Sequence, residues 1–315
     1  MVKLAYIFPG QGSQSTGMGL DLCENFKSAK QVYDDADKIL NKKISDICFN
    51  GPDEELKKTI NAQSAIVATS LAAFESFKEL CPELKPIVTL GHSLGEYCAL
   101  YCANVMDFET TMKAIQKRSE LMDIATKDYD GAMAAIIGLD IEKIKEVLVE
   151  VSSIGIAQIA NYNDKSQIVI TGEKEAILKA CEIMKEKGAK RALPLAVSGG
   201  FHSKLMNSAT EGFVEFVKDL DLKSAQIPVI TNVDANQTIN VEEFREKMPN
   251  QINSSVMWYQ SIEKAVEMGV EAFIEFGNGK VLSGLNKKIC PEIKTYNIFD
   301  KESLMAVVNE LTIGV

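Results

Sequence analysis

The sequence predicts an α/β protein in which a large domain with a parallel central sheet carries an inserted, smaller subdomain. Two observations predict the large domain. Short apolar runs lead into glycine-rich turns and then helices near both ends of the chain, and residues 86–96 read as a strand, a sharp turn and a helix. A third observation predicts the subdomain, because the rhythm of the chain changes between residues 131 and 195.

The first strand is predicted at residues 4–8, and a glycine-rich loop follows it at residues 9–14. Glycines free the backbone N–H groups of such a loop to point at a ligand, so the loop is a candidate cradle for an anion or an oxyanion. The alternative is a flexible connection between a strand and a helix. Apolar periodicity then predicts an amphipathic surface helix at 26–40 and a helix buried almost all round at 62–80, with Gln63 at its start.

Residues 86–96 carry the candidate nucleophile. An apolar, β-rich run reaches Gly-His-Ser-Leu-Gly, and the segment after it reads as a helix. In such a nucleophile elbow the serine lies at a strained apex, and the glycines two residues to either side let the strand and the helix approach closely. Ser93 is therefore the predicted nucleophile. The pattern is short, and the alternative is an ordinary glycine-containing turn.

A helix predicted at residues 107–126 carries an arginine on its buried face. Arg118 falls in the apolar stripe, three residues after Ile115 and four before Met122. A buried, unpaired arginine is costly, so Arg118 must pair with a protein carboxylate or face a cavity that receives an anion. Because Arg118 lies on the helix after the elbow helix, we favour a ligand carboxylate, which the guanidinium binds through two parallel hydrogen bonds.

Residues 128–197 are predicted to form the inserted subdomain, and residues 1–127 and 198–315 the large domain. Strand and helix patterns alternate in the insertion in the order βαββαβ, the split unit of a ferredoxin-like fold. The predicted strands are 131–137, 155–161, 167–171 and 191–195, and the predicted helices are 141–151 and 173–187.

The chain has two histidines, of which His202 is the predicted base. His92 adjoins Ser93, where its side chain would diverge from that of the serine. His202 lies in a glycine-rich turn that opens a helix, so it is the better candidate by elimination if Ser93 needs an imidazole. No acidic residue stands out as the third member of a triad, and a backbone carbonyl could orient the imidazole instead.

The remaining elements of the large domain follow His202. Buried strands are predicted at 227–232 and 272–276, and an amphipathic helix at 301–311 closes the chain. Gly-Asn-Gly-Lys at 277–280 opens another helix. A glycine-flanked helix start can bind phosphate, but most such turns are only connections.

Composition narrows the partners and the compartment. The net charge of −10 argues against non-specific nucleic-acid binding and gives no reason to expect a membrane surface as partner. The seven cysteines lack CxxC spacing, which predicts neither disulfides nor a zinc site. Cys98 and Cys102 could share a metal on one helix, but two small buried side chains are the favoured interpretation. No segment approaches the roughly 18 apolar residues that cross a bilayer, so we expect a cytoplasmic protein.

Seven motifs, in order along essentially the whole chain, make the sequence resemble the malonyl-CoA:acyl carrier protein transacylases, the bacterial-type stand-alone acyltransferases of fatty-acid synthesis. The motifs are FPGQGSQ at 8–14, AQSA at 62–65, GHSLGEY at 91–97, QKRSELM at 116–122, GGFHS at 199–203, TNVDA at 231–235 and GNGKVLSGL at 277–285. Seven ordered motifs are a far more specific signal than any one of them.

The resemblance implies a fold and a set of catalytic groups. The fold would be an α/β-hydrolase-like body with a ferredoxin-like insertion, and the active site would lie in the cleft between them. Ser93 would be the nucleophile and His202 its base, held by the main-chain carbonyl of Gln251. The backbone N–H groups of Gln11 and Leu94 would form the oxyanion hole.

The resemblance also implies specificity. Arg118 would clamp the malonyl carboxylate, and Gln63 would line the same pocket. Phe201 matches the malonyl-selecting form of its motif, since relatives that accept the branched methylmalonyl unit tend to carry serine there and a ring would crowd the extra methyl group. Two departures are Gly-Asn-Gly at 277–279 in place of Gly-Pro-Gly, and Asn-Ser-Ser at 253–255 where relatives often have Asn-Pro.

The implied reaction is a ping-pong transfer of the malonyl group from malonyl-CoA to the phosphopantetheine thiol of acyl carrier protein, through a malonyl-serine intermediate. It requires no metal or redox cofactor, because the CoA thioester is itself the substrate. We expect a monomer whose partners are malonyl-CoA and the acidic carrier, with no nucleic acid and no membrane. A basic patch would dock the carrier. The candidates are Lys187, Lys190, Arg191, Lys204, Lys287 and Lys288.

Three alternatives stay open at this point. A serine hydrolase or thioesterase would use the same elbow but pass the acyl group to water; Arg118 and the missing acidic residue argue against it. An acyltransferase of a polyketide pathway would differ only in its carrier. A carrier-binding module with a relict elbow would not depend on Ser93.

Overall fold

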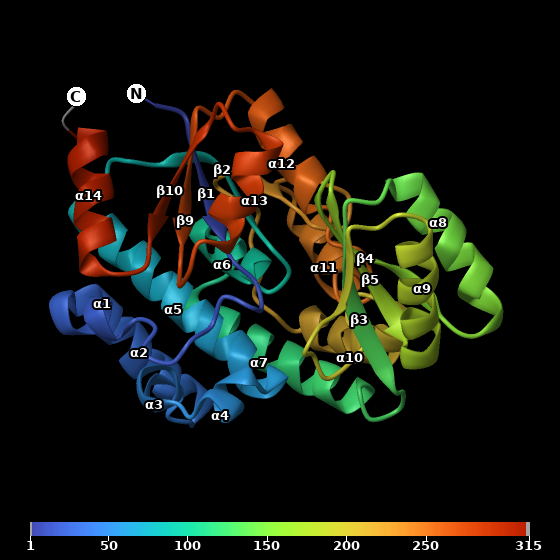
Figure 1. Ribbon diagram of the computed structural model, residues 1–315. Helices are drawn as coiled ribbons and strands as arrows, with labels where there is room; N and C mark the ends of the chain where they lie inside the picture. Colours follow the sequence, from blue (N-terminus) through green and yellow to red (C-terminus); the bar gives the residue numbers. More distant parts are fainter. Residues whose placement is uncertain (1, 313–315) are drawn as a thin grey trace.

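The computed structural model describes residues 2–312, in which the strands form two separate sheets (Figure 1). The larger sheet has the order β10-β9-β1-β2-β7-β8. Its strands are β1 (Leu4–Phe8), β2 (Pro86–Gly91), β7 (Val229–Ile230), β8 (Gln237–Thr238), β9 (Ala272–Phe276) and β10 (Lys294–Ile298). Every neighbouring pair is parallel except β7 with β8, so the predicted parallel central sheet is confirmed.

Helices cover both faces of the larger sheet and one face of the smaller sheet. Those of the first part of the chain are α1 (Leu20–Asn25), α2 (Lys27–Leu40), α3 (Ile44–Asn50), α4 (Asp53–Lys57), α5 (Thr59–Leu80), α6 (Gly95–Cys102) and α7 (Phe108–Ala125). The later ones are α8 (Ile141–Glu150), α9 (Lys174–Glu186), α10 (Asn207–Lys218), α11 (Val241–Asn250), α12 (Trp258–Glu267), α13 (Val281–Ile289) and α14 (Lys301–Thr312), with short 3-10 turns η1 (Val151–Ser153) and η2 (Lys204–Met206).

Both faces of the larger sheet are buried, as expected for parallel strands linked by helices. Alternate side chains of β1 point to opposite faces. Tyr6 and Phe8 pack against the rings of α5 on one face. Ala5 and Ile7 lie on the other face, in a cluster with residues of α12 and α13. The elbow at the end of β2 is therefore held in a rigid three-layer body.

The smaller sheet confirms the ferredoxin-like prediction. Its strands are β3 (Gly131–Ile137), β4 (Ala157–Asp164), β5 (Gln167–Glu173) and β6 (Arg191–Pro194), paired antiparallel in the order β4-β5-β3-β6. The chain order is β3, α8, β4, β5, α9, β6. Helices α8 and α9 cover the face turned away from the body and share a separate core with the sheet (Figure 1). The division at residues 127/128 and 197/198 stays a prediction.

Several elements differ from their predicted bounds. The strand predicted at 227–232 pairs only at Val229 and Ile230, because the chain then enters a tight turn in which Ala235 has φ 54°. Strand β10 was not predicted, since its Lys-Thr-Tyr-Asn-Ile sequence is partly exposed at the sheet edge and lacks a continuous apolar run. The sequence also did not reveal the short helices α1, α3 and α4, nor α11 and α12. No helix among residues 2–312 is long and apolar enough to cross a membrane.

Candidate active site

The elbow predicted around Ser93 is present at the carboxyl end of β2. Ser93 has φ 53°, the left-handed conformation that a non-glycine residue rarely adopts. A Cβ atom on Gly91 would lie 2.0 Å from the carbonyl carbon of Gly95, and one on Gly95 would lie 2.2 Å from the carbonyl oxygen of Phe8. Glycine is therefore required on both sides of the serine, because the helix and the strands meet there without room for a side chain.

Ser93 and His202 are 109 residues apart in the sequence and form a hydrogen bond of 2.7 Å between Oγ and Nε2. His202 also has a positive φ, 56°, in the turn before η2. Its Nδ1 lies 3.0 Å from the carbonyl oxygen of Gln251 and 3.1 Å from that of Ser254. Both partners are acceptors, so Nδ1 carries the hydrogen and Nε2 is left to accept a proton from the serine.

The imidazole of His202 is neutral. Burial, and then the positive charge of Arg118, lower the pKa of His202 to about 3. Among residues 2–312, no carboxylate is within salt-bridge distance of this side chain. A neutral imidazole held by two carbonyls has the tautomer that a general base requires.

Arg118 lies on the buried face of α7 and is 1% exposed. Its Nη1 donates to Oε1 of Gln63 at 2.5 Å, and its Nη2 donates to Oε1 of Gln251 at 3.1 Å and to Oγ of Ser93 at 3.2 Å. In the part of the chain that the structure describes, Arg118 pairs with no carboxylate. The structural ion pair considered from the sequence is therefore absent there: the guanidinium has amide and hydroxyl hydrogen-bond partners at the elbow and lies over the ring of Tyr97.

The two predicted oxyanion donors differ in their surroundings. Leu94 is buried directly after Ser93, while Gln11 is exposed in the loop after β1 and lines the cavity beside Ser93. Within residues 2–312, neither backbone N–H donates a hydrogen bond to a protein acceptor. Both are thus available for a ligand oxygen, which is what an oxyanion hole needs.

A cavity of about 380 Å³ opens between the two sheets and contains the elbow. Ser93, Arg118 and His202 lie in its wall on the side of the large body, and Met133, Ala135 and Val169 of the smaller sheet form the facing side. The cavity lies between the body and the insertion, where the active-site cleft is expected from the sequence. A second cavity of about 550 Å³ lies at the opposite end of β2, and none of the predicted site residues lines it.

Of the two residues predicted to line the pocket, Phe201 does so and Gln63 does not. Phe201 is 4% exposed and lines the cavity. Gln63 is fully buried and does not line it, because Arg118 lies between them: the Gln63 amide oxygen holds Nη1 of the arginine. Gln63 therefore contacts the site through Arg118, which corrects its predicted place in the pocket wall.

His92 points away from the serine, as expected from the sequence. Its Nε2 lies 2.9 Å from Oδ1 of Asn163, and burial lowers its pKa. Cys98 and Cys102 are buried thiols, and burial raises the pKa of each. Among residues 2–312, no group of three or more His, Cys, Asp or Glu side chains has the arrangement of a metal site.

The sequence did not reveal Asn232, Glu96 and Ser254 as neighbours of the elbow. Asn232 and Glu96 are buried and hydrogen-bonded to each other behind Ser93, and Ser254 supplies the second carbonyl on His202. The sequence carries only a weak signal: Asn232 lies in the TNVDA motif and Glu96 in GHSLGEY, but the motifs alone indicate no role for either residue.

This α/β-hydrolase-like fold, with an elbow serine, a neutral imidazole and a cavity between body and insertion, defines an acyl-transferring enzyme. A family model described as "Acyl transferase domain" matches residues 5–285. The chain belongs to this family, and within it to the malonyl CoA-acyl carrier protein transacylases. It is 45% identical over 312 residues to the protein of that name from Bacillus subtilis, covering 99% of this chain and 98% of the relative. It is 39% identical over 307 residues to that of Haemophilus influenzae, covering 98% of each.

Solved structures agree with this family. An acyl carrier protein S-malonyltransferase from Vibrio cholerae superposes with a TM-score of 0.93 at 39% identity, covering 97% of this chain and 99% of that chain. A malonyl-transacylase in complex with a type II PKS acyl-carrier protein superposes with a TM-score of 0.95 at 37% identity, covering 98% and 99%.

Proposed function

We propose that this enzyme transfers the malonyl group from malonyl-CoA to the phosphopantetheine thiol of an acyl carrier protein in fatty-acid biosynthesis, through a malonyl ester on Ser93. One observation carries the proposal: the same hydroxyl is hydrogen-bonded to a neutral imidazole and to a buried arginine without a carboxylate partner among residues 2–312. The imidazole supports acyl transfer, and the arginine supports an acyl group that bears an acid.

In the first half-reaction, Nε2 of His202 takes the proton of Ser93 while Oγ attacks the thioester carbonyl. The N–H groups of Gln11 and Leu94 bind the oxyanion. The C–S bond then breaks, and the imidazolium returns its proton to the departing CoA sulfur. The malonyl carboxylate pairs with Arg118, so the ester is held by its far end while CoA leaves.

In the second half-reaction, the carrier thiol enters the same cavity and gives its proton to His202. Its sulfur attacks the ester carbonyl, the C–O bond to Ser93 breaks, and the serine regains the proton. Acid-base chemistry and one covalent intermediate account for every bond change, so the proposal includes no cofactor beyond the CoA thioester substrate.

Pairing of the malonyl carboxylate with Arg118 also adjusts the base. The arginine's positive charge contributes to the low pKa of His202, so an anion on the guanidinium raises that pKa and makes the imidazole a stronger base. An acetyl group lacks this effect. The site therefore couples recognition of the acid to activation of the nucleophile.

The proposal includes a monomer, since Ser93, His202, Arg118 and Gln251 bond to one another and the proposed steps need no group from a second copy. It places the enzyme in the cytoplasm, since seven free cysteines suit a reducing compartment. Among the candidate carrier-docking residues, Lys187 and Lys288 already form ion pairs with Glu150 and Asp164. The Lys187–Glu150 pair is exposed, contributes little and can be exchanged for a carrier carboxylate, whereas Lys288 is tied to the buried carboxylate of Asp164.

Intact-mass spectrometry tests the proposal. Malonyl-CoA should add one malonyl mass to the wild-type protein and none to Ser93→Ala, and only the carrier with its phosphopantetheine should then remove the group. An unmodified wild-type protein contradicts the transferase, and rapid CoA release without carrier favours the hydrolase. A polyketide carrier is the second candidate recipient, because the solved relative with a type II PKS carrier has nearly the same fold. A panel of fatty-acid and polyketide carriers distinguishes the two.

A further inference from the structure

Behind the elbow, all four polar groups of Asn232 are hydrogen-bonded, three of them to the segment that carries Ser93. Its Oδ1 accepts from the backbone N–H of Ser93 at 2.7 Å, and its Nδ2 donates to the carbonyl oxygen of Gly91 at 2.7 Å. Its own N–H donates to Oε2 of Glu96 at 2.6 Å, and its carbonyl oxygen accepts from Met257 at 3.0 Å. Asn232 is fully buried.

We infer that Asn232 is a positioning residue for the reaction: it clamps the strained peptide of Ser93 and so keeps Oγ in line with His202. This inference rests on the proposed role of Ser93 as nucleophile. The clamp joins three parts of the elbow, namely the end of the strand at Gly91, the apex at Ser93 and the first turn of the helix at Glu96.

The chemistry of the clamp requires an amide. The Ser93 N–H needs an acceptor. The carbonyl of Gly91, two residues earlier in the chain, needs a donor. A neutral amide offers one of each in a fixed plane. An ionised carboxylate would place an oxygen against the Gly91 oxygen, and an alkyl side chain would leave both backbone groups buried without partners. Because Asn232 occupies the Ser93 N–H, the neighbouring N–H of Leu94 is the one left for an oxyanion.

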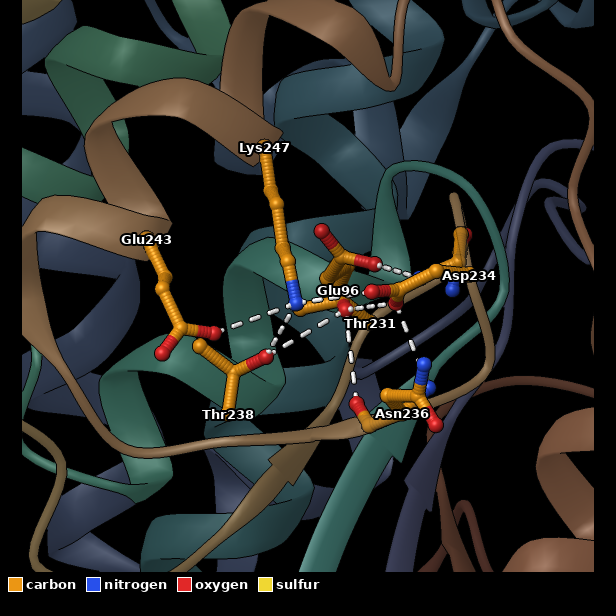
Figure 2. A network of polar contacts seen from close by, with 8 residues as sticks. Glu96, Thr231, Asp234, Asn236, Thr238, Glu243 and Lys247 are labelled. Atoms are coloured by element: carbon orange, nitrogen blue, oxygen red, sulfur yellow. Dashed lines mark hydrogen bonds and ion pairs between the residues drawn. The ribbon is translucent and has the colours of Figure 1, made fainter.

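The segment that carries Asn232 is itself anchored. Figure 2 shows Glu96 beside a polar network that runs through Thr231 and Asp234 to Lys247 on α11. The Thr231 hydroxyl donates to Asp234 at 2.7 Å, and Lys247 pairs with Asp234 at 2.9 Å. Lys247 also donates to the Thr238 hydroxyl at 2.8 Å. A side chain mounted on such a braced turn can hold a strained φ at Ser93, whereas one on a loose loop could not.

The test compares Asn232→Ala with Asn236→Ala. Asn236 lies on the same turn, is exposed, and makes no side-chain hydrogen bond within residues 2–312. We expect Asn232→Ala to lower kcat for malonyl transfer by about 10- to 100-fold with KM for malonyl-CoA changed by less than about threefold, because the bound substrate is kept but the hydroxyl is misaligned. Asn236→Ala should keep the wild-type kcat. An Asn232→Ala kcat within about threefold of wild type, or a loss shared by Asn236→Ala, overturns the inference.

Asn232→Asp gives a second readout, which stands even where the alanine variant does not fold. Below its pKa, the new carboxyl group has one acceptor and one O–H donor and reproduces the amide pattern. Burial beside Glu96 raises that pKa. The kcat of Asn232→Asp relative to wild type should therefore rise by about tenfold or more between about pH 8 and about pH 6. A ratio that stays constant with pH overturns the inference, since a purely structural defect has no such dependence.

A third measurement separates this inference from the proposed function. Phenylmethylsulfonyl fluoride, a neutral serine reagent, should modify wild type, leave Ser93→Ala unmodified, and modify Asn232→Ala about 10- to 100-fold more slowly. Transfer activity in Ser93→Ala contradicts the proposed function. Loss of activity in Ser93→Ala together with wild-type modification of Asn232→Ala contradicts only the clamp.

Discussion

Nη2 of Arg118 lies 3.2 Å from Oγ of Ser93, so the cation that we assign to the acyl carboxylate directly contacts the atom that we assign to attack the acyl carbonyl. We therefore expect Arg118 to favour an acyl group that bears a carboxylate close to its carbonyl, as the malonyl group does.

Arg118→Ala should lower kcat/KM for malonyl transfer by about 3 kcal/mol, roughly 100-fold, because a buried charge-assisted pair is lost. Acetyl transfer has no such pair and should be spared. Steady-state rates with both acyl-CoA substrates check this. Lys113→Ala, which removes an exposed basic side chain from the same helix α7, is the matched control. Equal losses for malonyl and acetyl groups would refute the clamp.

The pH dependence of Ser93 reactivity should report His202. Burial and Arg118 lower the pKa of His202 to about 3. The rate at which a neutral serine reagent modifies Ser93 should therefore not fall near about pH 6.5, where protonation of an ordinary histidine would produce an acid limb. In Arg118→Gln, the positive charge that disfavours the imidazolium is gone, so the acid limb should move to higher pH. Intact-mass kinetics across pH measure the position of this limb, with Lys113→Gln on the same helix as the control. A wild-type limb near about pH 6.5 would contradict a buried neutral base.

Phe201→Ser should let the site accept methylmalonyl-CoA. The ring lines the cavity and is 4% exposed, and its removal opens space for one methyl group beside the acyl chain. Space for one methyl changes the ratio of kcat/KM for methylmalonyl to malonyl by about tenfold or more. Competition between the two substrates, read by the mass of the acyl-enzyme, gives this ratio. Phe201→Tyr keeps a ring in place and should leave the ratio unchanged; a serine variant that still rejects methylmalonyl would show that another residue excludes it.

Glu96→Gln should change how stability depends on pH. Burial raises the pKa of Glu96 to about 7, against an ordinary value of 4.5. Between these values the folded chain keeps a proton that the unfolded chain releases, so the free energy of unfolding falls as pH rises through this window. The glutamine variant has no such loss. Its stability relative to wild type should increase by on the order of 3 kcal/mol from below about pH 4.5 to above about pH 7.

Denaturant unfolding at several pH values measures this difference. Glu243→Gln is the control, because Glu243 belongs to the same polar network but is exposed (Figure 2). A difference between Glu96→Gln and wild type that does not change with pH would contradict a raised pKa at Glu96.

Much of the site could be predicted because its signals are local. The elbow can be recognised as Gly-x-Ser-x-Gly because only glycine fits on either side of the serine. A Cβ atom on Gly91 or Gly95 would lie about 2 Å from a backbone atom of the neighbouring segment. Arg118 was placed on the buried face by its distance from apolar neighbours on one helix. His202 followed by elimination, because the chain has only two histidines.

The sequence by itself determined the fold class, the ferredoxin-like insertion, Ser93, and the inward position of Arg118, since turn chemistry and helical periodicity act over a few residues. Only the tertiary structure decided what surrounds them. Asn232 meets Ser93 across 139 residues, and Gln251 and Ser254 hold His202 through backbone carbonyls. Every residue type has the same carbonyl, so such partners leave no mark in a sequence. They are selected when the sheet and its loops close around the elbow, because buried polar groups must find partners there.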